Sequence, residues 1–204
     1  MKTYPTIEHA DRGNGQHCIG FEKYDGSNLR FEWSPKRGWF KCGTRTRLFD
    51  ESDPDFGAAV PMFVEDLGIE VQAICQDRLP RKQKLTQVIA FVEFFGPSSF
   101  AGTHNPDELK ELRLIDVVVN RRGFLDPADF VSWFGGLDEM ARVVYEGTMT
   151  GSFIRDVQEG RFGVNEGIVC KGGHRHRRWM LKIKTDEYKR RVQEAFGVEW
   201  KKVW

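Results

Sequence analysis

The sequence predicts an α+β fold with largely antiparallel sheets. Three observations support this class: short runs rich in Val, Ile and Phe recur along the chain, helical patterns separate them irregularly, and glycines stand singly at turn positions. The order lacks the regular strand–helix alternation that produces a parallel sheet. A chain of 204 residues can bury a core without disulfides, so we expect one domain over residues 1–204.

The strands are predicted from apolar runs with turn residues on both sides. They are expected at 18–22, 29–33, 39–43, 87–95, 112–119, 167–171 and 179–184. Arg121-Arg122-Gly123 has the composition of a hairpin turn, and the last two strands are expected to pair with each other.

The helices follow from apolar spacing and from capping residues. Apolar residues three and four positions apart predict a helix over 53–75, and Gly68 interrupts this pattern, so one helix or two are expected. Asp126-Pro127 is typical of a helix start. Two further helices are expected over 153–159 and over 185–196, the second capped by Thr185 or Asp186.

Composition excludes several classes of protein. The mean hydropathy is −0.51, and no run approaches the roughly 18 apolar residues of a membrane span, which excludes an integral membrane protein. The N-terminal residues lack the apolar core of a signal peptide, and none of the four cysteines stands in a CxxC pair. We therefore expect a cytoplasmic protein with reduced thiols and without a membrane partner.

Charge is unevenly distributed although the net charge is only +1. Residues 50–77 contain eight acids and neither Lys nor Arg, whereas residues 171–191 contain nine Lys or Arg against two acids. A neutral protein with a basic face can bind a polyanion on that face, although two solvated surfaces would give the same pattern.

Lys182 and Lys184 stand two residues apart in a predicted strand. Residues two apart on a strand share a face, so both ammonium groups point away from Leu181 and Ile183. Two such cations repel each other unless an anion lies between them, and a phosphate fits that place. The alternative is an exposed amphipathic strand.

Four segments resemble, in order, the motifs of the covalent nucleotidyltransferase superfamily of polynucleotide ligases and mRNA capping enzymes. Lys23-Tyr24-Asp25-Gly26 resembles its KxDG motif, and Glu93 resembles its Glu-containing strand. Residues 166–171 resemble its EGxVxK motif, and residues 182–184 resemble its KxK strand. The resemblance extends from about residue 4 to about residue 190 and implies an adenylation domain, with no room for an OB domain after Lys184.

Within the superfamily, the chain is most similar to the ATP-dependent RNA ligases. Their lysine motif commonly reads KxxGxN, which Asn28 fits, whereas DNA ligases and capping enzymes usually have Arg there. Residues 41–46 resemble the family's arginine motif, with Arg45 or Arg47 as its arginine. Residues 114–125 resemble the family's FDI strand and hairpin, with Ile115 in place of a purine-stacking aromatic.

The resemblance implies that Lys23 attacks the α-phosphate of ATP to give lysyl-AMP. Free lysine is mostly protonated at neutral pH, and nearby cations lower an amine's pKa. Lys182 and Lys184 would also neutralise the α-phosphate in the transition state. The residues expected to bind the nucleotide are Glu22, Lys23, Ser27, Asn28, Arg45, Glu93, Ile115, Glu166, Lys182 and Lys184. Glu166 and Asp25 would hold Mg²⁺ or Mn²⁺.

The implied partner is RNA, as a nicked duplex or as free ends, and DNA stays an alternative. AMP would pass to a 5′-phosphate before a 3′-hydroxyl seals the strand. Arg175, Arg177 and Arg178 lie in a basic loop expected to contact nucleic-acid phosphates, with an accessory protein as another source of grip. The competing hypotheses are a minimal DNA ligase, a GTP-using capping enzyme and a non-catalytic nucleic-acid-binding module.

Overall fold

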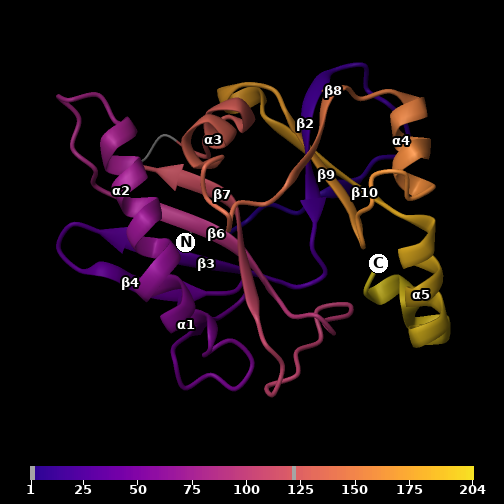
Figure 1. The fold of residues 1–204 in the computed structure, drawn as a ribbon, viewed down its shortest axis with the longest axis horizontal. Helices are drawn as coiled ribbons and strands as arrows, with labels where there is room; N and C mark the ends of the chain where they lie inside the picture. The colour runs from indigo at the N-terminus through magenta and orange to yellow at the C-terminus, as the bar shows by residue number, and fades with distance from the viewer. Residues whose placement is uncertain (1–2, 121–122) are drawn as a thin grey trace. The chain divides into compact units, whose positions relative to one another are not determined.

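The computed structural model describes residues 3–120 and 123–204, which fall into two compact units (Figure 1). Unit 1 comprises the described residues of 1–5 and 26–141, and unit 2 comprises 6–25 and 142–204. Each unit contains one five-stranded sheet and its own helices. The predicted α+β class with largely antiparallel sheets is confirmed.

The sheet of unit 1 has the order β5-β4-β3-β6-β7, and every neighbouring pair is antiparallel. Its strands are β3 (Ser27–Ser34), β4 (Gly38–Gly43), β5 (Leu48–Phe49), β6 (Val88–Phe95) and β7 (Glu111–Val119). Phe31 of β3 is fully buried and stacks on the equally buried Phe63 of the following helical segment, with ring centroids 4.0 Å apart. The predicted strands at 29–33, 39–43, 87–95 and 112–119 are confirmed within two residues.

The helical segment of unit 1 begins later than the spacing predicts. It consists of α1 (Ala59–Met62), a π-helix (Phe63–Leu67) and α2 (Gly68–Arg78), with no break at Gly68. Residues 53–58 do not join the helix because the Asp53 carboxylate accepts hydrogen bonds from the amides of Asp55 and Phe56, which favours a turn. A Cβ on Gly68 would lie 2.7 Å from the Phe63 carbonyl oxygen, so close packing explains this glycine.

Helix α3 (Pro127–Phe134) begins as predicted, with Asp126 at the N-cap and Pro127 at the first helical position. The predicted hairpin turn at residues 121–123 involves two residues outside the described part of the chain.

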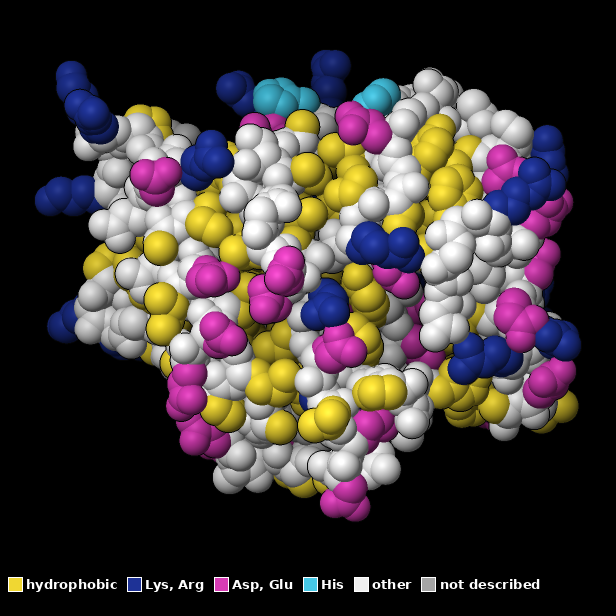
Figure 2. Space-filling model, in the orientation of Figure 1, with side chains coloured by type: hydrophobic (Ala, Val, Ile, Leu, Met, Phe, Trp, Pro, Cys, Tyr) yellow, Lys and Arg dark blue, Asp and Glu magenta, His cyan; other side chains and the backbone are white. Residues whose placement is uncertain are grey.

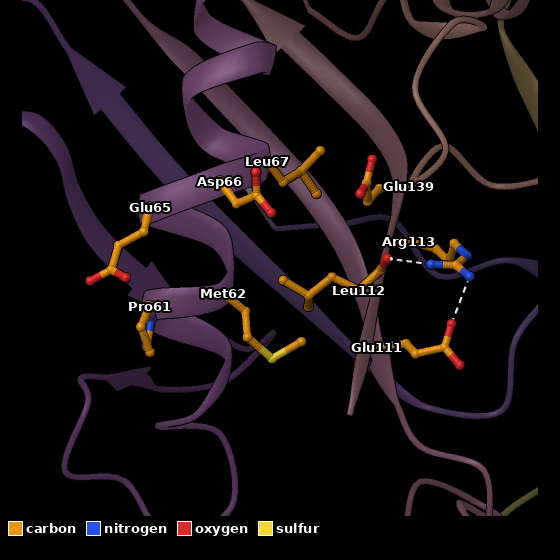
Figure 3. A pocket seen from close by; sticks show the side chains of 9 residues that line it. All are labelled: Pro61, Met62, Glu65, Asp66, Leu67, Glu111, Leu112, Arg113 and Glu139. Carbon is orange, nitrogen blue, oxygen red and sulfur yellow. Dashed lines mark hydrogen bonds and ion pairs between the residues drawn. The ribbon is translucent and has the colours of Figure 1, made fainter. Parts of the chain in front are cut away.

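Unit 1 also contains an acidic pocket of about 530 Å³ beside the π-helix and β7 (Figure 3). Its lining residues are Pro61, Met62, Glu65, Asp66, Leu67, Glu111, Leu112, Arg113 and Glu139. The guanidinium of Arg113 donates to the Glu111 carboxylate at 2.6 Å, which leaves the other three carboxylates without a cation in the lining. Figure 2 likewise shows acidic side chains gathered over this part of unit 1. This field repels phosphates, so the pocket does not fit the polyphosphate of a nucleotide.

The sheet of unit 2 has the order β1-β10-β9-β2-β8, with only β1 parallel to its neighbour. Its strands are β1 (Glu8–His9), β2 (His17–Lys23), β8 (Val143–Thr148), β9 (Gly167–Gly172) and β10 (Trp179–Lys184). The predicted strand at 18–22 is confirmed, and so is the pairing of 167–171 with 179–184. Strand β8 was not predicted because it is a largely exposed edge strand without a continuous apolar run.

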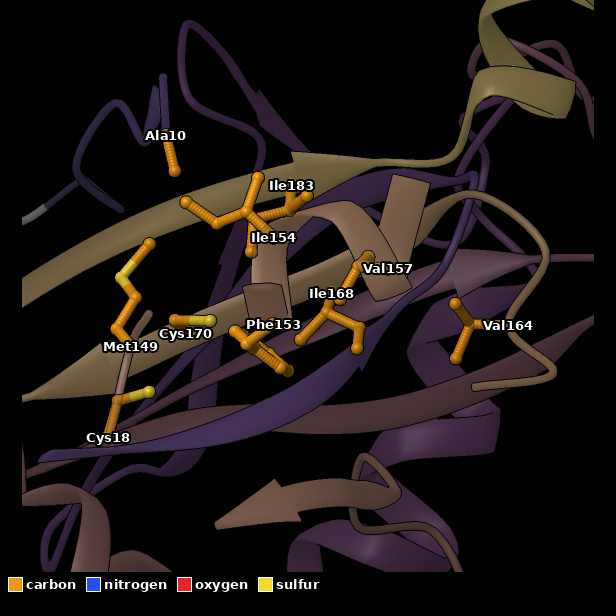
Figure 4. Packing of buried hydrophobic residues seen from close by; sticks show 10 residues of the cluster. All are labelled: Ala10, Cys18, Met149, Phe153, Ile154, Val157, Val164, Ile168, Cys170 and Ile183. Atoms are coloured by element: carbon orange, nitrogen blue, oxygen red, sulfur yellow. The ribbon is translucent and has the colours of Figure 1, made fainter. Parts of the chain in front are cut away.

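Two helices flank this sheet. Helix α4 (Gly151–Gln158) packs against β9 and β10, and its Phe153 and Ile154 meet Ile168, Cys170 and Ile183 in a buried cluster (Figure 4). Helix α5 (Asp186–Phe196) begins where predicted, because the Thr185 hydroxyl accepts a hydrogen bond from the amide of Tyr188 at 3.1 Å. Both predicted helices are confirmed.

Two short 3-10 helices complete unit 2, at Arg175–Arg177 and at Gly197–Lys202. Among the helices of residues 3–120 and 123–204, none combines the length and the apolar character needed to cross a bilayer.

Candidate active site

Strand register in unit 2 brings three of the motif segments together. Lys23 is the last residue of β2 and Lys184 is the last residue of β10, and both pair with Gly167 of the central strand β9. Glu166 immediately precedes Gly167. The two lysines therefore lie on either side of the strand that begins after Glu166.

The Glu166 carboxylate bridges the two ammonium groups. Its Oε2 lies 2.8 Å from Lys23 Nζ, and its Oε1 lies 3.0 Å from Lys184 Nζ. The side chains of Glu166 and Lys184 are 3% and 4% exposed, whereas that of Lys23 is 21% exposed. Of the two amines, Lys23 is thus the one that a substrate can reach.

Gly167 makes this close arrangement possible. A Cβ at this position would lie 2.0 Å from the carbonyl oxygen of Ile183 and 2.8 Å from the Cα of Lys184. No side chain fits there without moving β10 away from β9. The glycine of the EGxVxK-like segment therefore has a packing function beside the two charged residues.

Burial and neighbouring charges determine the ionisation of this cluster. Burial lowers the pKa of Lys184, the nearby Lys23 lowers it further, and the Glu166 carboxylate opposes both effects. The Lys184 ammonium also lies 4.8 Å from the Tyr188 ring centroid and 4.7 Å from that of Trp204, which favours the cation. The amine is thus desolvated but held by a carboxylate and two aromatic faces.

Asp25 belongs to the same neighbourhood. The Tyr188 side chain forms a hydrogen bond with Asp25, and burial, followed by the carboxylates of Glu166 and Asp25, raises the pKa of Tyr188. The hydroxyl therefore stays protonated and available as a donor.

The alternation predicted for β10 is confirmed. Ile183 points into the buried cluster of unit 2, and the preceding Leu181 packs against that cluster. Lys182 and Lys184 share the opposite face, where Lys182 lies in register with His9 of β1.

Glu22 points away from Lys23 and is paired with Arg142, whose Nε lies 2.9 Å from the Glu22 carboxylate. The same guanidinium donates to the Gly163 carbonyl oxygen. Because its side chain is on the face opposite Lys23 and pairs with Arg142 there, Glu22 has the weakest structural support among the predicted nucleotide-binding residues.

In unit 1, the structure brings Asn28 and Glu93 side by side, since they are in register on β3 and β6. Glu93 is also in register with Arg113 on β7, and Ile115 stands two residues further along β7, at a bulge. Arg113 and Ile115 are partly exposed and alternate with the buried Leu112 and Leu114. Three of the predicted nucleotide-binding residues therefore lie on neighbouring strands of one sheet.

Ser27 lies at the start of β3 and contacts a residue that the sequence did not single out. Its Oγ lies 2.8 Å from His104 Nε2, and the imidazole packs against the rings of Phe56 and Phe94. Burial lowers the pKa of His104, followed by the charge of Lys110. His104 is 77 positions from Ser27, so no local pattern could have revealed the contact.

The two candidate arginines of the arginine motif differ in their partners. Arg47 forms ion pairs with Asp53 and Asp55, and its guanidinium lies over the Phe56 ring. Arg45 is exposed in the same turn. The ion pairs of Arg47 favour Arg45 as the residue that meets a ligand.

The predicted nucleic-acid-binding arginines lie in the loop between β9 and β10. Arg175 and Arg177 are exposed, whereas Arg178 is partly buried and its guanidinium contacts the Met180 sulfur at 3.7 Å. The loop folds back tightly, with a positive φ of 51° at Arg175.

The carboxylates fit a metal ion only together with substrate oxygens. In the part of the chain that the structure describes, no cluster of three or more His, Cys, Asp or Glu side chains could hold a metal alone. A carboxylate has about four lone-pair sites, and two of those on Glu166 are engaged by lysines. Mg²⁺ is commonly bound by one or two carboxylates plus phosphate oxygens, which Glu166 and Asp25 can provide.

A family model described as RNA ligase matches residues 16–184. No curated protein matches the chain significantly. Among solved structures, an archaeal ATP-dependent RNA ligase is 14% identical, with a TM-score of 0.66 over 96% of this chain and 52% of its own. A Naegleria gruberi RNA ligase mutant with ATP and Mn is 15% identical, with a TM-score of 0.60 over 91% of this chain and 58% of its own. The chain thus spans little more than half the length of these ligases.

Proposed function

Because the chain belongs to the RNA ligase family, we propose that it is an ATP-dependent RNA ligase that works through a lysyl-AMP intermediate. The observation that carries this proposal is the buried Glu166 carboxylate that bridges Lys23 and Lys184. A structural ion pair needs one lysine, whereas a pair of lysines around one carboxylate provides a nucleophile and a separate phosphate-binding cation. The Naegleria gruberi ligase structures with ATP and Mn support ATP as the nucleotide.

In the first step, Lys23 Nζ attacks the α-phosphorus of ATP. The Lys23 ammonium first loses one proton to solvent; as the new P–N bond forms, the bond to the leaving pyrophosphate breaks, and the second proton of the amine passes to the pyrophosphate or to solvent. An adjacent carboxylate favours the ammonium form, so the Lys23–Glu166 ion pair has to open when ATP binds. Lys184 and Lys182 would then neutralise the α-phosphate as its charge grows.

The nucleoside would be held by residues of β3, β6 and β7 in unit 1 and by Arg45 in the turn after β4. Asn28 and Glu93 offer an amide and a carboxylate to ribose hydroxyls, and Arg45 would contact the sugar or a phosphate. The hydroxyl of Ser27, the first residue of β3, would form a hydrogen bond with the nucleotide. Ile115 would pack against the base in place of an aromatic ring.

The metal would be held by Glu166 and Asp25. When bound, Mg²⁺ or Mn²⁺ supplies positive charge to the phosphate oxygens. Tyr188 orients Asp25 through its hydrogen bond, which fixes one of the two carboxylates before the ion arrives.

We propose RNA as the polynucleotide, with AMP passed to a 5′-phosphate before the strand is sealed. Asn28 favours RNA over DNA ligase function because the superfamily's DNA ligases usually have Arg at this position. The exposed guanidinium groups of Arg175 and Arg177 would contact backbone phosphates, and the partly buried Arg178 would add positive charge beside them. We further propose that residues 1–204 act as one adenylation domain and that an accessory protein is an additional source of RNA binding.

The direct test is covalent labelling with α-labelled ATP and Mg²⁺, followed by denaturing electrophoresis. The wild-type protein is expected to retain label, and Lys23→Ala is expected to retain none. The matched control is Lys36→Ala, at an exposed position in a turn of unit 1, which is expected to label as the wild type does. Labelling by GTP instead of ATP would favour a capping enzyme, and absence of label from both would favour the non-catalytic binding module.

Nicked duplexes then test the polynucleotide. A 5′-phosphorylated nick in RNA is expected to be sealed faster than the same nick in DNA. Equal or faster sealing of DNA would overturn the choice of RNA while leaving the lysyl-AMP chemistry in place.

A further inference from the structure

His9 lies on the lysine face of the unit 2 sheet. Strand β1 runs parallel to β10, with Glu8 paired to Leu181 and His9 paired to Lys182. Residues in register on neighbouring strands share a face, so the His9 imidazole is on the side of Lys182 and Lys184, opposite the buried Ile183. No motif described above includes His9.

The contacts of the imidazole leave one nitrogen unused. The ring stacks on Trp204, with centroids 5.3 Å apart and planes 12° apart, and it forms a hydrogen bond with the Trp204 backbone. Its Nε2 is buried and has no hydrogen-bond partner among the described residues. We therefore assign the proton of the neutral ring to Nδ1, which donates to the Trp204 carbonyl, and the free lone pair to Nε2.

Burial and neighbouring positive charge together disfavour a proton on Nε2. Burial lowers the pKa of His9, and the ammonium groups of Lys182 and Lys184 lower it further. The hydrogen bond to the Trp204 backbone and the Asp11 carboxylate raise the pKa of His9, but its net change is still a decrease. An anion placed beside the two lysines would cancel their repulsion and would accept a hydrogen bond from a protonated Nε2.

We infer that His9 is a third phosphate-binding residue beside Lys182 and Lys184, neutral in the free protein and protonated when a phosphoryl group binds. The inference rests on the proposed function, because that function places a phosphate at these lysines. The ligand is a phosphoryl group, either of the ATP polyphosphate or at the 5′ end of RNA. Trp204 acts as a positioning residue that fixes the plane of the imidazole.

Proton linkage gives the inference a distinctive signature. The complex binds more protons than the free protein wherever the pH lies between the two His9 pKa values, so affinity rises as the pH falls through this window. Affinity reaches its upper level below the pKa of the free protein and loses the His9 contribution above the pKa of the complex.

The test is calorimetric titration of the full chain with inorganic pyrophosphate, across pH and in buffers with different ionisation enthalpies. His9→Gln keeps a polar side chain but cannot become a cation, and His17→Gln is the matched control at a 65% exposed histidine in the same unit. We expect the wild type to bind about tenfold more tightly than His9→Gln at the acidic end, with convergence at alkaline pH. Comparing variants cancels the protonation of pyrophosphate itself.

Wild type and His17→Gln should take up protons on binding, and His9→Gln should take up fewer. Equal affinities and equal proton uptake for wild type and His9→Gln at every pH would overturn the inference. If the melting temperature of His9→Gln is similar to that of His17→Gln, the fold is preserved. Trp204→Phe keeps an aromatic ring to stack on the imidazole and should retain the proton uptake.

Two further titrations identify the phosphate. If His9→Gln weakens the binding of ATP but not of a 5′-phosphorylated oligoribonucleotide, the site belongs to the polyphosphate. An effect on a 5′-phosphorylated oligoribonucleotide, absent from its 5′-hydroxyl counterpart, assigns it to the RNA end. The His9 inference and the proposed function can fail separately, because pyrophosphate binding needs no covalent step. If Lys23 is not labelled by ATP but pyrophosphate binding still shows proton uptake that depends on His9, lysyl-AMP formation is refuted and the phosphate site is retained.

Discussion

In unit 2, the candidate site consists of charges buried against one another, whereas the strand ends of unit 1 present neutral hydrogen bonds and one partly exposed carboxylate. Lys23, Glu166 and Lys184 form a single ionic group, while Ser27 bonds His104 and Asn28 lies beside Glu93. Buried charges are costly unless they are paired, and the Glu166 carboxylate pairs with both ammonium groups here. This difference agrees with the proposed function, in which phosphate chemistry belongs to unit 2 and recognition of the nucleoside to unit 1.

The acidic pocket of unit 1 sharpens this contrast. The carboxylates of this pocket repel a polyphosphate, whereas the lysines of unit 2 attract one. The sign of the charge, rather than the size of a cavity, therefore identifies the candidate site.

The largest effect is expected on removing the shared carboxylate. Glu166→Ala leaves two lysines without their common anion, and we expect the free energy of unfolding to fall by about 3–5 kcal/mol. Chemical denaturation measures this loss, with Glu22→Ala as the control because its ion pair with Arg142 is more exposed. A loss for Glu166→Ala no larger than that for Glu22→Ala would remove the distinction between buried and exposed pairs.

A smaller loss is expected from Gly167→Ala. The added methyl group would meet the Ile183 carbonyl oxygen, and we expect destabilisation by about 3 kcal/mol together with weaker adenylation. Gly136→Ala is the matched control, because its added methyl group has no heavy atom within 4 Å. If thermal melting shows equal stability for both variants, the close approach of β9 and β10 is not required.

The two arginines of unit 1 test nucleotide recognition. Arg45→Ala is expected to raise the KM for ATP about tenfold through loss of a charged hydrogen bond. Arg47→Ala is expected to leave KM within about twofold, because its ion pairs are on the surface. Steady-state adenylation measures both values, and the opposite ranking would assign the arginine motif to Arg47.

The smallest effect concerns the Ser27–His104 contact. A double-mutant cycle of Ser27→Ala and His104→Ala should give a coupling free energy of about 0.5–1.5 kcal/mol in stability. Additive effects of the two substitutions would show that the 2.8 Å contact contributes nothing on its own.

The sequence predicted most of the fold because its signals are local. The Thr185 cap, the start at Pro127 and the alternation around Ile183 each depend on neighbours in the chain, and the structure confirms them. The start of the first helix was wrong because the side chain of Asp53 competes with helical hydrogen bonds, which spacing of apolar residues does not report.

The candidate site was predictable only where it matched known motifs. Lys23, Glu166 and Lys184 were identified by resemblance, and the structure brings them together. His9 and His104 lie in no motif, and their importance depends on contacts with Trp204 and Ser27 across long stretches of chain. Register and packing supply this information, and single-residue patterns do not.

The proposed function requires that Lys23 becomes covalently adenylated. The most direct measurement is mass spectrometry of the intact protein after incubation with ATP and Mg²⁺, followed by mapping of the modified peptide. We predict a mass gain of one adenylate on Lys23, reversed by added pyrophosphate and missing in Lys23→Ala. An unmodified protein, or an adenylate on another residue that persists in Lys23→Ala, would contradict the account.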